Sequence, residues 1–319
     1  MKTFEEILNS GLINITELEN YRLEQKEIGN QKIKKLIPFY IAGFVLLSII
    51  LTLFGLIILI PVLLFIEVMI LLTIRNISNS KFIETFQESV IKKIMQSFDN
   101  SFEYKPNEWI PEQEFKASNF MPNCDSYRGE DYFFGKFENI SLQISQISSS
   151  KKMTSSRTLC FFEGIFITAE FKQPFEGRTT IIPEELVKKI DSISRNMYQS
   201  PNIKNDIRLN FNDVNVEFEK NFGVFTNNAD EAINKIIKGN LINYLLELNK
   251  KSERGVFFSF SGQKIYIGFN NSSNIFQIDI KNQVNEENLK KYYSEIILIL
   301  NNILTIYSIL EENTAFNKS

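Results

Sequence analysis

An apolar stretch near the N-terminus dominates the hydropathy pattern of the chain. Residues 36–74 contain one acidic or basic side chain, that of Glu67. A single helix of this length would extend for roughly 58 Å, about twice the hydrocarbon thickness of a bilayer. The pattern therefore predicts two antiparallel transmembrane helices, 36–54 and 56–74, which reverse direction at Gly55.

Positive residues flank this stretch on both outer sides. Lys32, Lys34 and Lys35 precede it, Arg75 and Lys81 follow it, and the turn between the helices has no charge. Because positive flanks stay in the cytoplasm, both termini are expected to be cytosolic. The turn also lacks polar residues, so a wedge that enters and leaves the bilayer by one face is the alternative.

Glu67 is the membrane residue with a functional expectation. A carboxylate in hydrocarbon is costly and marks an ion path, a proton site or a helix–helix contact. Reflecting the hairpin about Gly55 brings Glu67 near Gly43 and Tyr40. We favour a protonated Glu67 bonded to Tyr40 or to its copy in a neighbouring subunit; a small oligomeric pore lined by Glu67 is the alternative.

Residues 1–35 have the pattern of a short helix followed by a longer one. Thr16 with Glu19 fits a capping box at the start of the second helix, and Asn14 with Glu17 is an alternative cap. We expect an N-terminal cytosolic helical segment.

Residues 75–319 predict a cytosolic α+β domain with largely antiparallel strands. A helix is expected over 81–98, and Tyr198–Asp206, which contains Pro201, is a candidate internal boundary. The expected strand pairs are 132–137 with 141–147, 158–171 with 178–182, 214–218 with 222–225 across Lys220–Asn221, and 256–260 with 264–269 across Ser261–Gly262.

The last predicted helix, 286–310, carries apolar residues at a spacing of seven. Leu289, Ile296, Ile303 and Leu310 form this repeat. We favour a long helix that covers the sheet, and self-association into a homo-oligomer is the alternative.

Composition excludes several classes of chemistry. The 35 basic and 38 acidic side chains nearly balance, so no nucleic acid partner is expected. The chain has no histidine, which excludes histidine-dependent triads and zinc sites built by this chain alone. Two cysteines cannot close a zinc site, and no cofactor motif occurs.

Two polar clusters are weak candidates for binding. Asp125, Glu130 and Asp131 carry carboxylates that could hold a hard cation, although we favour a turn with solvated acids. Lys172 and Arg178 flank a turn that could contact lipid headgroups, although a simple hairpin tip is the favoured interpretation. We assign no catalytic residue and no metal site.

Several short motifs carry a family resemblance. They are Phe115-x-x-Ser118-x-Phe120, Asp125-x-Tyr127-x-Gly129-Glu130-Asp131, Gly135, Phe162-x-Gly164-Ile165-Phe166, Phe175-x-Gly177-Arg178-Thr179, Ile182-Pro183, Phe218-Glu219-Lys220-x-Phe222-x-Val224-Phe225, Asp230-Glu231-Ala232 and Phe258-Ser259-Phe260-Ser261-Gly262. In this order they resemble the bacterial family catalogued as domain of unknown function 3137. Ser145-Gln146 departs from the Ser-Glu expected there. The resemblance implies a membrane-anchored bacterial protein with a cytosolic domain, and it implies no reaction.

The sequence thus predicts a non-enzymatic, multi-pass protein of the bacterial inner membrane. Its cytosolic domain would bind or scaffold a protein, a lipid surface or a small ligand. A carboxylate- or metal-dependent hydrolase and a small membrane pore are the alternatives.

Overall fold

The computed structural model describes residues 2–120, 124–152, 158–193, 206–211, 215–252, 254–271, 276 and 278–315. Helices and an antiparallel β-sheet make up the fold, with a long helix near the N-terminus and another at the C-terminal end. This much of the expected fold class is confirmed. The chain divides into two compact units: Met1–Ser97 with Ile275–Ser294, and Phe98–Asn274 with Glu295–Ser319. The domain limits expected at residues 35 and 74 refer to membrane contact and stay predictions.

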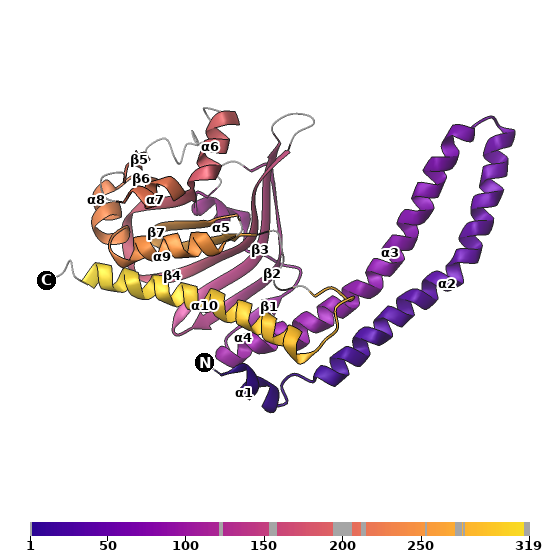
Figure 1. Ribbon diagram of the computed structural model, residues 1–319, viewed down its shortest axis with the longest axis horizontal. Helices are drawn as coiled ribbons and strands as arrows, with labels where there is room; N and C mark the ends of the chain where they lie inside the picture. The colour runs from indigo at the N-terminus through magenta and orange to yellow at the C-terminus, as the bar shows by residue number, and fades with distance from the viewer. Residues whose placement is uncertain are drawn as a thin grey trace. The chain divides into compact units, whose positions relative to one another are not determined.

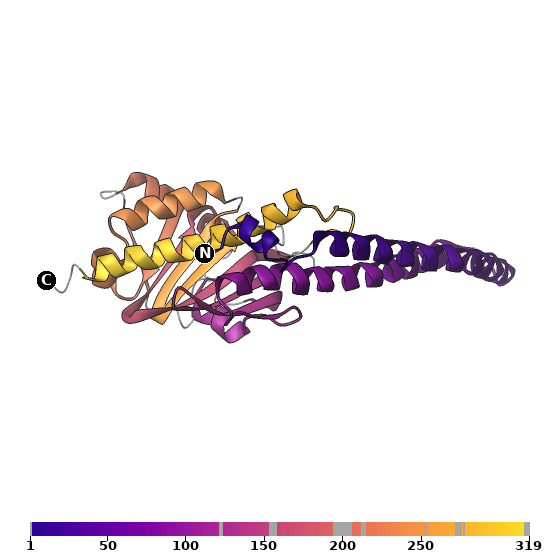
Figure 2. The ribbon, with the colours of Figure 1, turned by 90° about the horizontal axis from the view of Figure 1, so that it is seen from below.

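A helical hairpin forms most of the first unit. After α1 (Phe4–Asn9), α2 (Ile15–Leu53) and α3 (Ile60–Phe86) run side by side in opposite directions (Figures 1 and 2). The chain reverses through Gly55, whose φ is 71°, and a 3₁₀ turn (Ile57–Leu59). Pro61 lies in the first turn of α3, where its missing N–H leaves no helix bond unmade.

The N-cap of α2 is Asn14, whose side chain accepts a hydrogen bond from the Glu17 amide at 3.1 Å. The preferred capping box, Thr16 with Glu19, is therefore wrong and its alternative is correct. Glu19 has other partners: it pairs with Arg22 at 2.6 Å and accepts the Val284 amide at 2.7 Å. These bonds join α2 to the segment before the last helix.

Helix α3 continues through a π-helical turn (Gln87–Ile91) into α4 (Lys92–Phe98). The apolar face expected over residues 81–98 is buried in the structure. Its buried members are Phe82, Phe86, Val90, Ile91 and Ile94. Tertiary packing of this face stabilises the helix beyond the apolar hairpin.

One antiparallel sheet organises the second unit (Figure 1). Its strands follow the order β1 (Glu103–Lys105), β2 (Ser126–Phe137), β3 (Ile140–Lys152), β4 (Thr158–Pro183), β6 (Phe222–Thr226) and β5 (Ile207–Leu209), and β7 (Val256–Asn270) pairs with β4. The three-residue strands β1 and β5 form the edges, and short edge strands discourage pairing with other chains.

Strands β4 and β7 both double back. The Asn270 amide donates to the Gly255 carbonyl at 3.1 Å, which joins the two ends of β7 and requires a reversal at Gly262, where φ is 58°. The second half of β7 pairs with the first half of β4, as Ile267 does with Ile167. The first half of β7 pairs with the second half of β4, as Phe258 does with Ile181. The folded β7 therefore lies between the halves of β4. The predicted direct pairing of 158–171 with 178–182 is wrong for this reason.

An aromatic cluster fills the core beside α5 (Glu112–Ala117) and α6 (Glu184–Ile193). Phe115 contacts Phe166 with ring centroids 5.1 Å apart, and Phe120 contacts Phe257 at 5.4 Å. The buried cluster also includes Ile110, Ile147, Phe162, Ile182, Val187 and Tyr266. The first phenylalanine motif of the sequence is thus part of the core.

The remaining helices are α7 (Val216–Asn221), α8 (Ala229–Glu231) with a π-helical turn (Ala232–Ile236), α9 (Asn240–Lys251) and α10 (Glu286–Ala315). The expected strand before Lys220 is wrong, because the Asn215 side chain caps α7 by accepting the Phe218 amide at 2.9 Å. Of the candidate boundary at 198–206, only Asp206 lies among the described residues.

Helix α10 packs as a core helix along its length in the second unit. Its heptad residues Ile296, Ile303 and Leu310 are buried. Tyr307 contacts Phe171 of β4 with ring centroids 5.0 Å apart, and Tyr244 of α9 donates to Asn302 at 2.8 Å. Burial of the repeat agrees with the interpretation that this helix covers the sheet.

Candidate functional site

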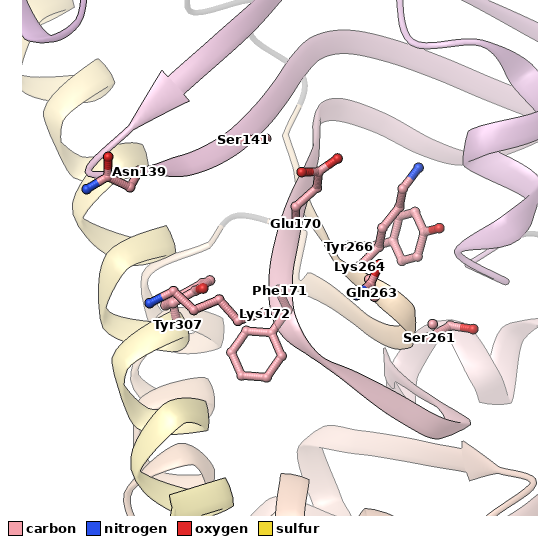
Figure 3. A pocket seen from close by; sticks show the side chains of 11 residues that line it. Asn139, Ser141, Glu170, Phe171, Lys172, Ser261, Gln263, Lys264, Tyr266 and Tyr307 are labelled. Atoms are coloured by element: carbon pink, nitrogen blue, oxygen red, sulfur yellow. The ribbon is translucent and has the colours of Figure 1, made fainter.

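A polar pocket of about 620 Å³ lies at one end of the sheet in the second unit. Figure 3 shows the lining residues, which come from the β2–β3 turn, β4, β7 and α10. The lining residues are Asn139, Ser141, Glu170, Phe171, Lys172, Ser261, Gly262, Gln263, Lys264, Tyr266 and Tyr307. The lining therefore includes hydroxyl, amide, charged and aromatic groups.

Two tight turns place the outer residues of the pocket. Phe137 pairs with Ile140, so Glu138 and Asn139 form the two-residue turn between β2 and β3. Both residues have positive φ, 48° and 66°, as in the turn type that matches the twist of a hairpin. Gly262 supplies the positive φ in β7. The pocket is thus built on short connections of a regular sheet.

The charges that line the pocket are unequally paired. Lys264 contacts Glu114 at 2.6 Å, and Lys172 contacts Glu311 at 3.0 Å. Glu170 stands opposite Lys264 in the sheet, yet it has no hydrogen bond or ion pair to any described residue. Its carboxylate is the lining charge that is open to a ligand.

The aromatic side chains of the pocket have specific partners as well. The Lys172 ammonium lies 5.9 Å from the Tyr307 ring centroid, a cation–π distance. The Tyr266 hydroxyl donates to Glu114 at 3.1 Å. Burial, followed by the neighbouring Glu114, raises the pKa of Tyr266, which therefore remains a hydrogen-bond donor at neutral pH. The arrangement offers binding groups for a small polar molecule.

The three candidate metal ligands lie in separate environments. Asp125 accepts the Lys152 amide at 2.9 Å, and Asp131 accepts the Tyr104 hydroxyl at 2.6 Å. Glu130 lies opposite Gln146 in the β2–β3 ladder. In the part of the chain that the structure describes, no three acidic or cysteine side chains are grouped to hold a metal ion. Asp125 thus bonds the end of β3 from a position just before β2, and Asp131 is buried within β2, so the expected turn with solvated acids is wrong.

The two candidate headgroup contacts differ in exposure. Lys172 is largely exposed although it pairs with Glu311. Arg178 is mostly buried and pairs with Asp206 at 2.9 Å. Burial raises the pKa of Asp206, and Arg178 counteracts part of this effect.

Glu67 and Tyr40 are half-buried in the hairpin, whereas their neighbours Ile66, Val68, Phe39 and Ile41 are exposed. This alternation places both residues on the faces that α2 and α3 turn toward each other. Among the described residues Glu67 has no hydrogen-bond partner, so its expected bond to Tyr40 is absent from this chain.

A comparison with known families matches part of the chain, with residues from both units. Residues 161–306 match the model of the family described as "Protein of unknown function (DUF3137)". These residues, somewhat less than half of the chain, are similar to a DUF3137 domain. The crystal structure of the mycobacterial trehalose monomycolate transport factor A, TtfA, is similar to this chain at a TM-score of 0.41 and 9% sequence identity, over 70% of this chain and 96% of that one. The search of curated proteins found no match.

Two motifs of the region similar to DUF3137 meet beside the pocket. The buried Glu231 carboxylate accepts the Glu176 amide at 2.8 Å and the Gly177 amide at 2.7 Å. A Cβ on Gly177 would lie 2.5 Å from that of Asn228, so only glycine fits there. Lys235 pairs with Glu176 at 2.8 Å. Together these contacts fix the bend between the halves of β4.

The pocket has little local signal in the sequence. Glu170 and Lys264 each break the apolar alternation of a strand, and this was the one local signal of a polar surface. Their convergence depends on the pairing of β4 with β7, almost a hundred residues apart. Glu114 joins them from α5, which no sequence pattern indicates.

Proposed function

We propose that this chain is a membrane-anchored, non-enzymatic binding protein of the bacterial inner membrane. The α2–α3 hairpin would cross the bilayer from the cytosolic side, and the domain similar to DUF3137 would bind a small polar ligand or a protein partner in the cytoplasm. The reason for this proposal is that the chain combines an apolar helical hairpin with a folded domain that has a polar pocket.

The observation that carries the membrane assignment is the outer surface of the hairpin. Between residues 36 and 74 the exposed side chains of α2 and α3 are almost all large and apolar, Leu46 and Phe65 among them. Contiguous apolar surface of this size is rare on proteins in water. Helix α2 is also long and apolar enough to span a bilayer.

Helix α10 passes the same test of length and composition, but 44% of its apolar window is buried within the protein. Its apolar residues already have packing partners on the sheet. We therefore propose α2 and α3, and not α10, as the lipid-facing helices.

The distribution of charge supports the orientation. Lys32, Lys34 and Lys35 end the polar part of α2, and Lys81 lies on α3 beyond the apolar stretch. Positive residues on both outer flanks favour a cytosolic location for the chain on either side of the hairpin.

The ligand would use the free carboxylate of the pocket. Glu170 suits a partner that carries a hydrogen-bond donor or a positive charge, and the amides and hydroxyls of Asn139, Ser141 and Gln263 add further contacts. Both lysines of the pocket already have carboxylate partners, so an anionic ligand is disfavoured.

Membrane anchoring is tested by alkaline carbonate extraction of membranes that contain the full chain. The wild type should stay in the pellet, and the double variant Leu46→Lys/Phe65→Lys should lose this behaviour. Leu23→Lys, at an exposed position of α2 outside the apolar stretch, is the matched control and should behave as wild type. Extraction of the wild type into the supernatant would overturn the anchor.

Binding is tested by purifying the full chain from native membranes and identifying bound molecules by mass spectrometry. Ser261→Trp should fill the pocket and lose the bound molecule, whereas Leu298→Trp, on the exposed surface of α10, should retain it. Equal retention by both variants would remove the pocket from the proposal.

A further inference from the structure

The turn of the hairpin satisfies its own backbone. The Phe54 amide donates to the Ile50 carbonyl at 3.1 Å, the Gly55 amide to Thr52 at 3.1 Å, and the Leu56 amide to Leu51 at 2.7 Å. The positive φ of Gly55 makes this closure of the helix end available. Buried backbone groups in lipid must find partners within the protein, whereas a turn in water has no such need.

The side-chain hydroxyls of the hairpin differ in their bonding, and the buried Ser48 hydroxyl has no hydrogen-bond partner in the described part of the chain. Thr52 donates its hydroxyl to the Ser48 carbonyl at 2.8 Å, and Thr73 donates to Met69 at 2.8 Å. Both threonine hydroxyls are thus bonded within their own helix, as are those of Thr85 and Thr305 outside the hairpin's apolar stretch.

The surface of the turn is apolar throughout. Phe54 is 76% exposed and Ile58 is 84% exposed, and residues 53–59 contain no polar side chain. Tryptophan and tyrosine, which favour the membrane–water interface, are also absent from this segment. Water would be an unfavourable environment for these side chains.

The length of the hairpin sets the depth of the turn. From Lys35 to Phe54 a helix rises about 28 Å, against a hydrocarbon thickness of about 30 Å. If Lys35 remains at the cytosolic headgroups, Phe54 ends just inside the acyl region of the opposite leaflet, and tilt of the helix moves it deeper.

We propose that residues 54–59 stay in the acyl chains of the far leaflet and form no aqueous loop. This inference rests on the proposed membrane anchor and goes beyond it. The hairpin crosses nearly the whole hydrocarbon layer, its turn binds lipid tails, and the turn offers no side chain to the aqueous phase on the far side.

The test is thiol labelling of the full chain in sealed vesicles of both orientations. The native cysteines, Cys124 and Cys160, lie in the second unit and are replaced by serine. Ile58→Cys is compared with Lys34→Cys, and the probe is a membrane-impermeant maleimide. We expect Cys at 34 to react from the cytosolic face alone, and Cys at 58 to react from neither face until detergent is added.

The labelling pattern distinguishes failure of the buried turn from failure of the membrane anchor. Labelling of position 58 from the far side alone would overturn the buried turn and leave the anchor intact. Labelling of both positions from the cytosolic face in intact vesicles would overturn the anchor itself. Unreactive position 58 with reactive position 34 supports the buried turn.

A spin label on the same Ile58→Cys variant removes the concern that packing blocks the maleimide. The measurement is the ratio of the label's collision rate with oxygen, which concentrates in hydrocarbon, to its collision rate with a water-soluble nickel chelate. We expect this ratio to equal that of Val45→Cys, a position that the same helix geometry places in mid-membrane. A ratio typical of Lys34→Cys would overturn the proposal.

Discussion

At the residue scale, one buried carboxylate holds the bend of β4. Glu231 accepts two backbone amides, and its neighbour Gly177 leaves no room for a side chain. A buried carboxylate with two such donors is stable where it lies, but loss of either bond leaves a backbone N–H without a partner.

Glu231→Gln should lower the free energy of unfolding by about 1–3 kcal/mol, because the new amide group would face a backbone donor. Chemical denaturation of the full chain in detergent, followed by the fluorescence of the sole tryptophan, Trp109, measures this. The control is Glu176→Gln, an exposed partner of Lys235, for which we expect a change below about 1 kcal/mol. Equal effects of both variants would contradict the role given to Glu231.

Glu67→Leu should leave the oligomeric state unchanged and raise the thermal stability of the protein in detergent. The reason is that Glu67 faces α2 of its own chain without a partner there, and in the proposed membrane anchor a carboxylate at mid-depth would cost about 2.5–3.5 kcal/mol. Analytical ultracentrifugation and a melting curve measure the two properties. Loss of an oligomer in Glu67→Leu, with its retention in Glu67→Gln, would instead place Glu67 between subunits.

The environment of the acidic residues Asp125, Glu130 and Asp131 could not be predicted from the residues alone. The favoured turn with solvated acids is wrong, because residues 126–137 form β2 and Asp125 bonds the amide of Lys152, 27 residues away. The burial of Asp131 was not foreseen, because it depends on a bulge after Glu130 and on the Tyr104 hydroxyl from another strand. Sequence shows which groups are present, and the register of the sheet decides which of them meet.

At the element scale, α10 offers a matched pair of leucines. Leu300 is fully buried, and Leu298, two residues earlier in the same helix, is 55% exposed. Leu300→Ala should reduce the free energy of unfolding by about 2–5 kcal/mol through loss of packing. Leu298→Ala should change it by no more than about 0.5 kcal/mol, as measured by denaturation. Similar losses would show that α10 does not depend on its buried face.

The Glu19–Arg22 contact predicts a dependence on pH in the first unit. The hydrogen bond from Arg22 keeps the pKa of Glu19 below its ordinary value of 4.5. The ionised pair therefore stabilises the fold above that pH, and its contribution disappears as the pH falls through the lowered pKa.

Between about pH 7 and about pH 3.5, the stability of the wild type should thus fall more steeply than that of Glu19→Gln. Denaturation followed by circular dichroism at both pH values measures the difference. Parallel acid dependence in the two proteins would show that Glu19 contributes no linkage.

Elements with a strong local signal were predictable. The apolar run, Gly55 and Pro61 defined the hairpin, and the burial of α10 followed its heptad pattern. The cap of α2 was misassigned because Thr16 and Asn14 offer equivalent local chemistry, and a distant segment, Val284, decides which carboxylate is used. Helix α7 was missed since six residues carry too little periodicity.

At the scale of the whole molecule, the sheet depends on pairing between remote segments. Hydrophobic alternation identified both halves of β4 and of β7, but it carries no information on which strand lies beside which. The match to the DUF3137 family covers both strands from residue 161 onward, together with most of α10. The region similar to the family therefore includes the paired strands β4 and β7.

The enclosure of β7 by β4 has a consequence for biosynthesis. A ribosome delivers the apolar hairpin and both arms of β4 well before it has translated Val256–Asn270. Until those codons are read, each arm of β4 has an unpaired edge where β7 will later insert, and such edges favour aggregation. A nascent chain stalled before Val256 should accordingly leave β4 sensitive to protease, and protection should arise in one step once the insert has emerged.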